Sequence, residues 1–296
     1  MSSLSLPALA ACSAILVTSA SPALAKLNGG KIEHRSATDP AAEIARLGRN
    51  ATPVWIAWKV PSRTRDSICG FGRNSRDWSI TLGEEESSWG TRDDAPQIGT
   101  SQVEIYAGIE NGEIRQLQFA SEGCPVQAGD HSVTLLDGVE PAASVAFLTR
   151  VAARWGEESS EADRGDKHRR GSRRDLAERA LSGLTFHDTP EGPLALVHLA
   201  REGAVDELRS QSLFWLAQSG APDAGRWIRE AITRDPDPDV REQGVFALSQ
   251  LPDSTTALLA VLRESQDRDV KQKALFWLGQ SDDPRAMAEL ERLLTH

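Results

Sequence analysis

Basic side chains are the minority charge in this chain of 296 residues. Its 33 lysines and arginines stand against 43 aspartates and glutamates, for a formal net charge of −10. A protein that binds nucleic acid through phosphate contacts needs a concentrated basic surface. The charge balance therefore argues against nucleic acid as a partner.

Residues suited to catalysis or metal binding are also scarce. The six histidines form no pair at helical metal-ligand spacing, and there is no Gly-x-Ser-x-Gly, no His-Glu-x-x-His and no phosphate-cradling glycine loop. We therefore assign no catalytic, cofactor-binding or metal-binding residue. A triad assembled only in three dimensions would escape a motif search, so an unrecognised enzyme stays open as an alternative.

Long apolar runs are missing except near the start of the chain. Residues 1–25 carry no charge and include the apolar stretch Ala8–Val17, followed by Ala23-Leu24-Ala25. This pattern predicts a signal peptide with cleavage before Lys26, and hence an exported, periplasmic or extracellular protein without a later membrane span. A lipoprotein anchored through Cys12 is the alternative.

Cysteine is rare, with three residues in the whole chain. Signal cleavage would leave Cys69 and Cys124, which lack the Cys-x-x-Cys spacing of redox and zinc motifs. An even pair in an exported protein predicts a disulfide, with two independent buried thiols as the alternative.

The first half of the mature chain predicts a small α+β domain over residues 39–155, with a mostly antiparallel sheet. Residues 26–38 show no periodicity and are expected to be a disordered start. Alternation predicts a strand over 54–60, with shorter candidates at 78–82 and 131–136, and a helix is expected over 141–155.

A β-hairpin is the sharpest local signal in this half. Asn111-Gly112 separates the alternating stretches 103–109 and 114–119, as in a type I′ turn. A regular ladder from that turn pairs Ile109 with Ile114 and Tyr106 with Leu117. Residues 156–173 then turn to charge, glycine and serine, which predicts a flexible linker.

Residues 174–296 contain one pattern four times, with repeats spaced by 32, 32 and 30 residues. Apolar columns at helical offsets, each followed by a proline and a second apolar run, predict four helical hairpins. The columns are Leu176, Leu208, Val240 and Val270; Leu181, Leu213, Val245 and Leu275; and Leu184, Leu216, Leu248 and Leu278.

The stretches DPDPDVREQGVFALSQL (235–251) and DRDVKQKALFWLGQSDDPRAMAELERLL (267–294) resemble HEAT repeats of the short bacterial, PBS-lyase-like type. This resemblance implies an all-α solenoid that follows the α+β domain. Such solenoids mostly serve as binding surfaces, and the fold alone names no partner. Some phycobilin lyases also use a HEAT-like solenoid, which is one form of the enzyme alternative; an unrecognised hydrolase in residues 39–155 is another.

Aromatic and amide columns run along the repeats beside the apolar stripe. They are either core packing or a partly exposed ridge of the kind used by binding hot spots. The candidate partner-binding residues are Phe214, Trp215, Gln218, Phe246, Gln250, Phe276, Trp277 and Gln280.

The favoured reading is an exported, non-enzymatic adaptor or scaffold that binds another protein through the solenoid, without cofactors. The polar final helix resembles a cap and argues against endless stacking, so a monomer or small homo-oligomer is expected. A structural homo-oligomer that uses the aromatic columns against itself is a further alternative.

Overall fold

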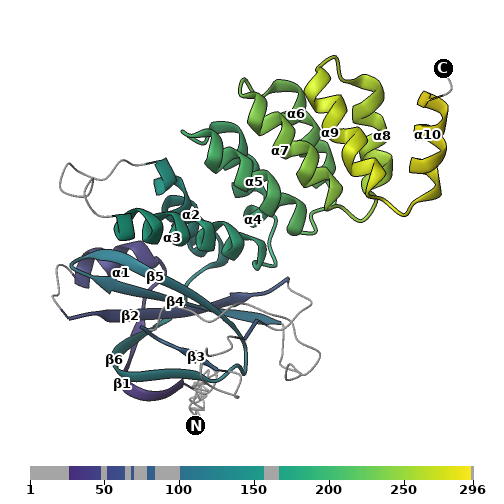
Figure 1. Cartoon of the computed structure of the whole chain (residues 1–296). Helices are drawn as coiled ribbons and strands as arrows, with labels where there is room; N and C mark the ends of the chain where they lie inside the picture. Colours follow the sequence, from purple (N-terminus) through teal and green to yellow (C-terminus); the bar gives the residue numbers. More distant parts are fainter. Residues whose placement is uncertain are drawn as a thin grey trace, which may run out of the picture.

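The computed structural model describes residues 27–47, 52–63, 68–69, 79–83, 101–156 and 167–294. In these ranges a mixed sheet of six strands is followed by a long helical region, as Figure 1 shows. The predicted α+β class with a helical C-terminal part is confirmed. The predicted signal peptide over residues 1–25 lies outside the described residues.

The sheet has the strand order β1-β6-β2-β4-β5, with the short β3 also paired to β6. Its strands are β1 (Leu27–Ser36), β2 (Val54–Pro61), β3 (Ile80–Thr81), β4 (Gln102–Glu110), β5 (Glu113–Ser121) and β6 (Val126–Asp137). β6 runs parallel to β1, β2 and β3, whereas β4 is antiparallel to β2 and β5. The sheet is therefore mixed rather than mostly antiparallel.

β1 corrects the expectation that residues 26–38 are a disordered start. This strand is largely exposed and lies at one edge of the sheet, where it pairs with β6 from Leu27 to Ser36. Its order comes from backbone hydrogen bonds to a strand about a hundred residues later in the chain. An edge strand with little apolar burial has no alternating pattern that could reveal it.

The two faces of β2 enter two different cores, as its alternation predicts. Ile56, Trp58 and Val60 belong to the core beneath the helices, whereas Trp55 and Ala57 belong to a second core on the opposite face. That second core also holds the disulfide pair. Burial on both faces explains why this central strand is almost wholly apolar.

The β4–β5 hairpin turns at Asn111 and Gly112, which have φ values of 54° and 78°. Ile109 pairs with Ile114 as predicted, but Tyr106 lies opposite Gln118 and not Leu117. A register shift between Gly108 and Ile109 displaces the rest of the ladder by one residue. Such a bulge is invisible to a register counted from the turn.

Cys69 and Cys124 lie at disulfide distance, with their Cα atoms 5.5 Å apart. Both are buried in the second core. This geometry confirms the predicted pairing of the two cysteines. The pair joins the end of the β4–β5 hairpin to the segment after β2.

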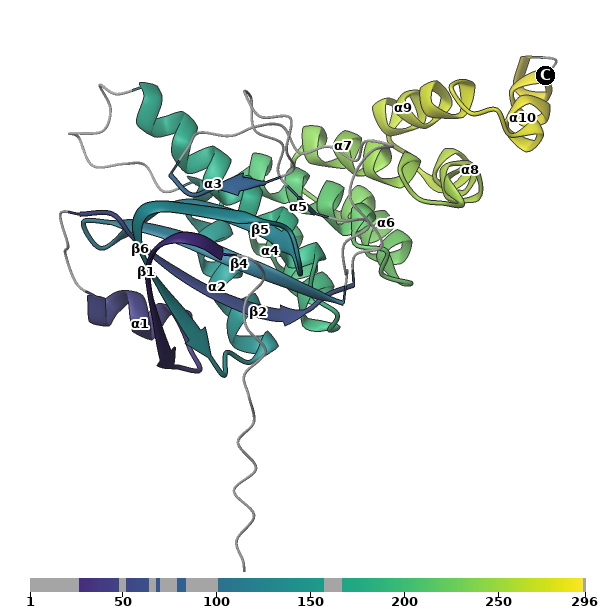
Figure 2. The same ribbon diagram turned by 90° about the horizontal axis from the view of Figure 1, so that it is seen from below.

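Helices cover the face of the sheet opposite the disulfide pair. Four helical hairpins then lead away from the sheet in a row (Figures 1 and 2). α1 (Pro40–Leu47), α2 (Pro141–Ala153) and the 3-10 turn η1 (Arg154–Gly156) precede them. The described residues form four hairpins, as predicted. They are α3 (Lys167–Thr185) with α4 (Glu191–Glu202), α5 (Asp206–Gln218) with α6 (Ala224–Arg234), α7 (Pro238–Ser249) with α8 (Ser254–Glu264), and α9 (Arg268–Gly279) with α10 (Pro284–Leu294).

α3 begins at Lys167, inside the stretch expected to be a flexible linker; residues 157–166 of that stretch lie outside the described residues. The helix packs directly on β5, where an added Cβ on Gly183 would approach Cζ of Phe119 to 2.4 Å. The Phe119 and Phe186 rings also meet edge to face, with centroids 5.3 Å apart. Glycine at position 183 is what lets the helix come this close.

The connection between α3 and α4 is hydrogen-bonded to the end of β2. Arg63 N donates to the Phe186 carbonyl and Asp188 N donates to the Pro61 carbonyl, each over 2.9 Å. One hydrophobic core runs from Ile56 in the sheet to Ala286 in α10. The sheet and the hairpins thus share a continuous core.

Within the described residues, no helix is both long and apolar enough to cross a membrane.

Candidate protein-binding surface

Three phenylalanines at equivalent places on α5, α7 and α9 form a row across neighbouring hairpins. Phe214 and Phe246 are partly buried and stack in parallel, with centroids 5.9 Å apart, while Phe276 is 54 % exposed. In the adjacent apolar column Leu181, Leu213 and Val245 are 1 % exposed or less, and Leu275 is half-buried. The phenylalanines therefore lie at the edge of the core rather than inside it.

Two tryptophans complete this row, and Ala247 replaces the third. Trp215 meets Phe214 at 5.2 Å, and Trp277 meets both Phe246 at 5.2 Å and Phe276 at 5.1 Å. We name the continuous set Phe214, Trp215, Phe246, Phe276 and Trp277 the aromatic ridge. Its rings are partly exposed along its length, which favours the ridge over core packing alone.

The indole nitrogens of the ridge point inward. Nε1 of Trp215 and Nε1 of Trp277 are buried and have no hydrogen-bond partner within the described residues. The hydrocarbon part of each indole is therefore what remains for contact at the surface. A ridge that presents apolar ring area and keeps its polar edges covered is suited to burial against another apolar surface.

The glutamine column flanks the ridge at the ends of the same helices. Gln218, Gln250 and Gln280 are all exposed, and the Gln250 amide donates to Ser249 Oγ over 3.0 Å. The structure thus places all eight predicted residues on one side of α5, α7 and α9. An apolar strip with a polar margin is the arrangement found in protein interfaces.

Ion pairs link α5 and α7 to the connections that lead into the next hairpin. Arg209 Nε donates to Asp235 Oδ2 over 2.8 Å, and Arg241 Nη2 lies 2.9 Å from Asp267 Oδ2. The hydrogen bond to Asp235 raises the pKa of Arg209. Lys271, the equivalent residue of the last hairpin, makes no ion pair with any described residue. These pairs therefore fasten the ridge-bearing helices α5 and α7 to the loops beside them.

Asp267 has a second role, because it caps α9. Its carboxylate accepts from the backbone N–H groups of Asp269 and Val270 over 2.9 and 3.3 Å. The bond from Val270, followed by that from Arg241, lowers the pKa of Asp267. Asp237 caps α7 in the same way. Caps and ion pairs therefore come from the same acidic loops.

A pocket of about 390 Å³ opens where the ridge reaches the first hairpin. Its described lining comes from one side of α3, from Phe186 beyond the end of that helix, and from Trp215 of α5. This pocket was not predicted from the sequence, although the aromatic column was visible there. The interruption of that column could have indicated the pocket, because Ser182, the residue of α3 equivalent to Phe214, has no ring. The lining residues are Asp175, Glu178, Arg179, Ser182, Phe186 and Trp215.

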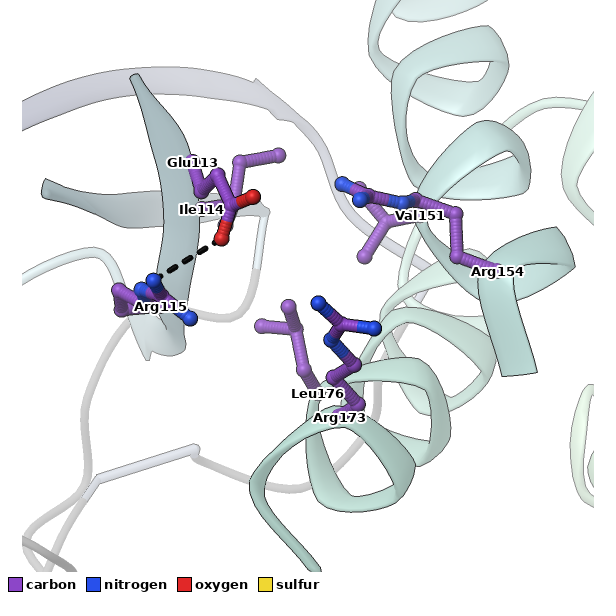
Figure 3. Close-up of a pocket in the computed structure, with 7 residues that line it drawn as sticks. All are labelled: Glu113, Ile114, Arg115, Val151, Arg154, Arg173 and Leu176. Atoms are coloured by element: carbon purple, nitrogen blue, oxygen red, sulfur yellow. Dashed lines mark ion pairs between the residues drawn. The ribbon is translucent and has the colours of Figure 1, made fainter. Parts of the chain in front are cut away.

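A second pocket lies between β5, the end of α2 and α3, and Figure 3 shows its basic lining. Arg115, Arg154 and Arg173 surround it, and Arg115 Nη2 pairs with Glu113 Oε2 over 2.9 Å. Its volume is about 20 Å³. That is room for a water molecule or two and not for an organic ligand.

The hydrogen bonding of His187 is the feature closest to a catalytic constellation. Its Nε2 lies 2.9 Å from Ser144 Oγ, and its Nδ1 lies 3.0 Å from the Gly183 carbonyl. Trp58 Nε1 donates to the same Ser144 Oγ over 2.9 Å. A carbonyl acceptor at Nδ1 places the ring proton there, so Nε2 accepts from the serine hydroxyl.

This constellation connects β2, α2 and the end of α3, and it is closed to solvent. Ser144 and His187 are both 0 % exposed, and burial lowers the pKa of His187 to about 4. A nucleophile must reach its substrate, and this serine contacts only protein. We interpret the network as a structural joint between the sheet and the first hairpin.

Within the described residues, no group of three histidine, cysteine, aspartate or glutamate side chains is arranged to hold a metal ion. Comparisons with protein-family models and with curated proteins give no match to this chain.

Proposed function

We propose that this protein is an exported, non-enzymatic adaptor or scaffold, a HEAT-like solenoid joined to a sheet domain, that binds another protein through the aromatic ridge. The observation that carries the proposal is the row of partly exposed rings in mutual contact across three hairpins. Large aromatic side chains at the centre of an interface supply most of its binding energy.

The architecture supports a binding role more than a catalytic one. The ridge lies on helices that ion pairs and caps fasten to the loops beside them, so its rings are ordered before a partner arrives. Order in the free protein lowers the entropy cost of association. The pair Cys69 and Cys124, at disulfide distance, supports an oxidising compartment and therefore export.

Affinity capture from the native envelope fraction tests the proposal. The bait is the chain from Lys26 onward, compared with a ridge variant that carries Phe214→Ser, Phe246→Ser and Phe276→Ser. We expect the wild type to retain a specific partner and the folded ridge variant to lose it. Circular dichroism and the thermal midpoint check that the variant is folded.

The matched control removes three other exposed apolar side chains. Ile32, Leu194 and Met287 are 44 %, 51 % and 50 % exposed and lie outside the ridge. The Ser variant at all three sites is expected to retain the partner. Equal retention by the ridge variant would refute a role for the ridge. The structural homo-oligomer would be supported instead if the wild type captured copies of itself and if its mass by light scattering fell to that of a monomer in the ridge variant.

A further inference from the structure

The ring column of the solenoid stops one hairpin short of the sheet. Phe214 stacks on Phe246, but the next place in the column belongs to Ser182, which lines the pocket of about 390 Å³. A side chain one ring in size is therefore missing at the end of the row. The volume lies in the range of pockets that enclose a ligand group.

The described lining of this pocket carries more acidic than basic side chains. Asp175 and Glu178 are exposed on the side of α3 that lines it, and neither forms an ion pair with a described residue. Arg179, the one basic residue of the described lining, extends toward the sheet, where its Nη1 donates to the Leu117 carbonyl over 3.5 Å. In the described lining the two carboxylates outnumber the single guanidinium, and this excess of negative charge favours a cationic occupant.

Trp215 of α5 lines the same pocket as the side chains of α3. A guanidinium is planar, stacks on an aromatic face and pairs with carboxylates in a fork geometry. The chain already makes contacts of the first kind, since Arg226 Cζ lies 5.3 Å from the Trp227 ring centre and Arg174 Cζ lies 5.6 Å from that of Trp155. An aromatic wall beside two carboxylates is the chemistry that holds an arginine.

We propose that the pocket binds an arginine side chain from an extended segment of the partner protein, with apolar neighbours of that arginine lying along the aromatic ridge. This inference rests on the proposed function and names the chemistry of the partner. The net charge of −10 would attract a basic segment and speed its approach at low salt.

A random 12-residue peptide library displayed on phage and selected on the mature chain tests the inference. Peptides that bind the wild type are sequenced, synthesised and measured by fluorescence anisotropy. We expect an arginine flanked by apolar residues, and a loss of affinity of about tenfold or more when citrulline, which is neutral and nearly the same shape, replaces it. Affinity should also fall as salt rises.

Variants of the pocket provide the second arm. Asp175→Asn with Glu178→Gln should weaken the arginine peptide about tenfold and leave the citrulline peptide unchanged. Glu202→Gln with Asp282→Asn removes the same charge from exposed places outside the pocket and should change affinity less than about twofold. Ser182→Phe, which supplies the missing ring, should fill the pocket. The arginine and citrulline peptides should then bind this variant with equal affinity.

Selected peptides without a basic residue, equal affinity for the arginine and citrulline forms, or failure to select any peptide would overturn the inference. The first two results leave the proposed function intact where the peptides still lose binding to the folded ridge variant. If the proposed function itself were wrong, the folded ridge variant would still retain the native partner.

Discussion

The pH dependence of stability gives a direct test of the buried joint between the sheet and the first hairpin. Burial lowers the pKa of His187 from 6.5 to about 4. Between these values the unfolded chain binds a proton that the native state excludes, so unfolding becomes easier as the pH falls. The stabilisation is fully present above about pH 6.5 and is lost progressively toward pH 4.

The size of the effect follows from the shift. One pKa unit corresponds to about 1.4 kcal/mol, so a shift of about 2.5 units contributes about 3 kcal/mol, of which about 2 kcal/mol should be gone at pH 5. This is a large part of the stability of an ordinary domain. His187 should therefore be visible above the background of surface carboxylates.

The assay is urea unfolding, followed by tryptophan fluorescence, at several pH values between 4.5 and 7.5. His187→Gln removes the titrating group, and the difference between wild type and variant should shrink by about 2 kcal/mol from pH 7.5 to pH 5. His198→Gln, at an exposed place on α4, is the matched control and should keep the wild-type slope. Identical slopes for wild type and His187→Gln, or an NMR titration of His187 near 6.5, would refute the reasoning.

Three further predictions concern the same framework. Gly183→Ala should destabilise the protein by about 1 to 3 kcal/mol, because the added methyl group collides with β5, whereas Gly279→Ala, with no atom within 4 Å of its new Cβ, should be neutral or slightly stabilising; chemical denaturation compares the two. Asp267→Ala loses the helix cap as well as its ion pair and should cost about 1 to 2 kcal/mol, while Asp267→Asn keeps the cap and should cost less in the same assay. Reduction of the Cys69–Cys124 bridge, which spans 55 residues, should lower the unfolding free energy by about 4 kcal/mol, and an unchanged denaturation midpoint after verified reduction would contradict this.

The hairpin array was accessible from sequence because each repeat carries its own apolar columns. Burial of Leu181, Leu213 and Val245 depends on the helical period and on stacking with a neighbour of the same pattern. The aromatic ridge was accessible for the same reason. Its partial exposure was one of two readings, and the choice between them required the geometry of the stacked helices.

The parts that sequence analysis missed depend on contacts between distant segments. β1 is ordered by pairing with β6, and the register of Tyr106 is displaced by a bulge at Gly108. The polar first turns of α3 carry no apolar period, so its start was placed in the linker. The partnership of His187 with Ser144 joins residues 43 positions apart and has no local pattern. The pocket depends on the interrupted column and on the packing of α5 beside α3.

The continuous core from the sheet to α10 has a consequence for how this protein can change in size. Solenoids need ends that shield the first and last repeats from water. Here the β4–β5 surface shields the first hairpin, with Gly183 fitted to Phe119. Additional hairpins can therefore be accommodated between the inner repeats or at the far end but not at the sheet. A protein of this architecture with more hairpins would have a longer row of rings, and the pocket beside the first hairpin would stay in place.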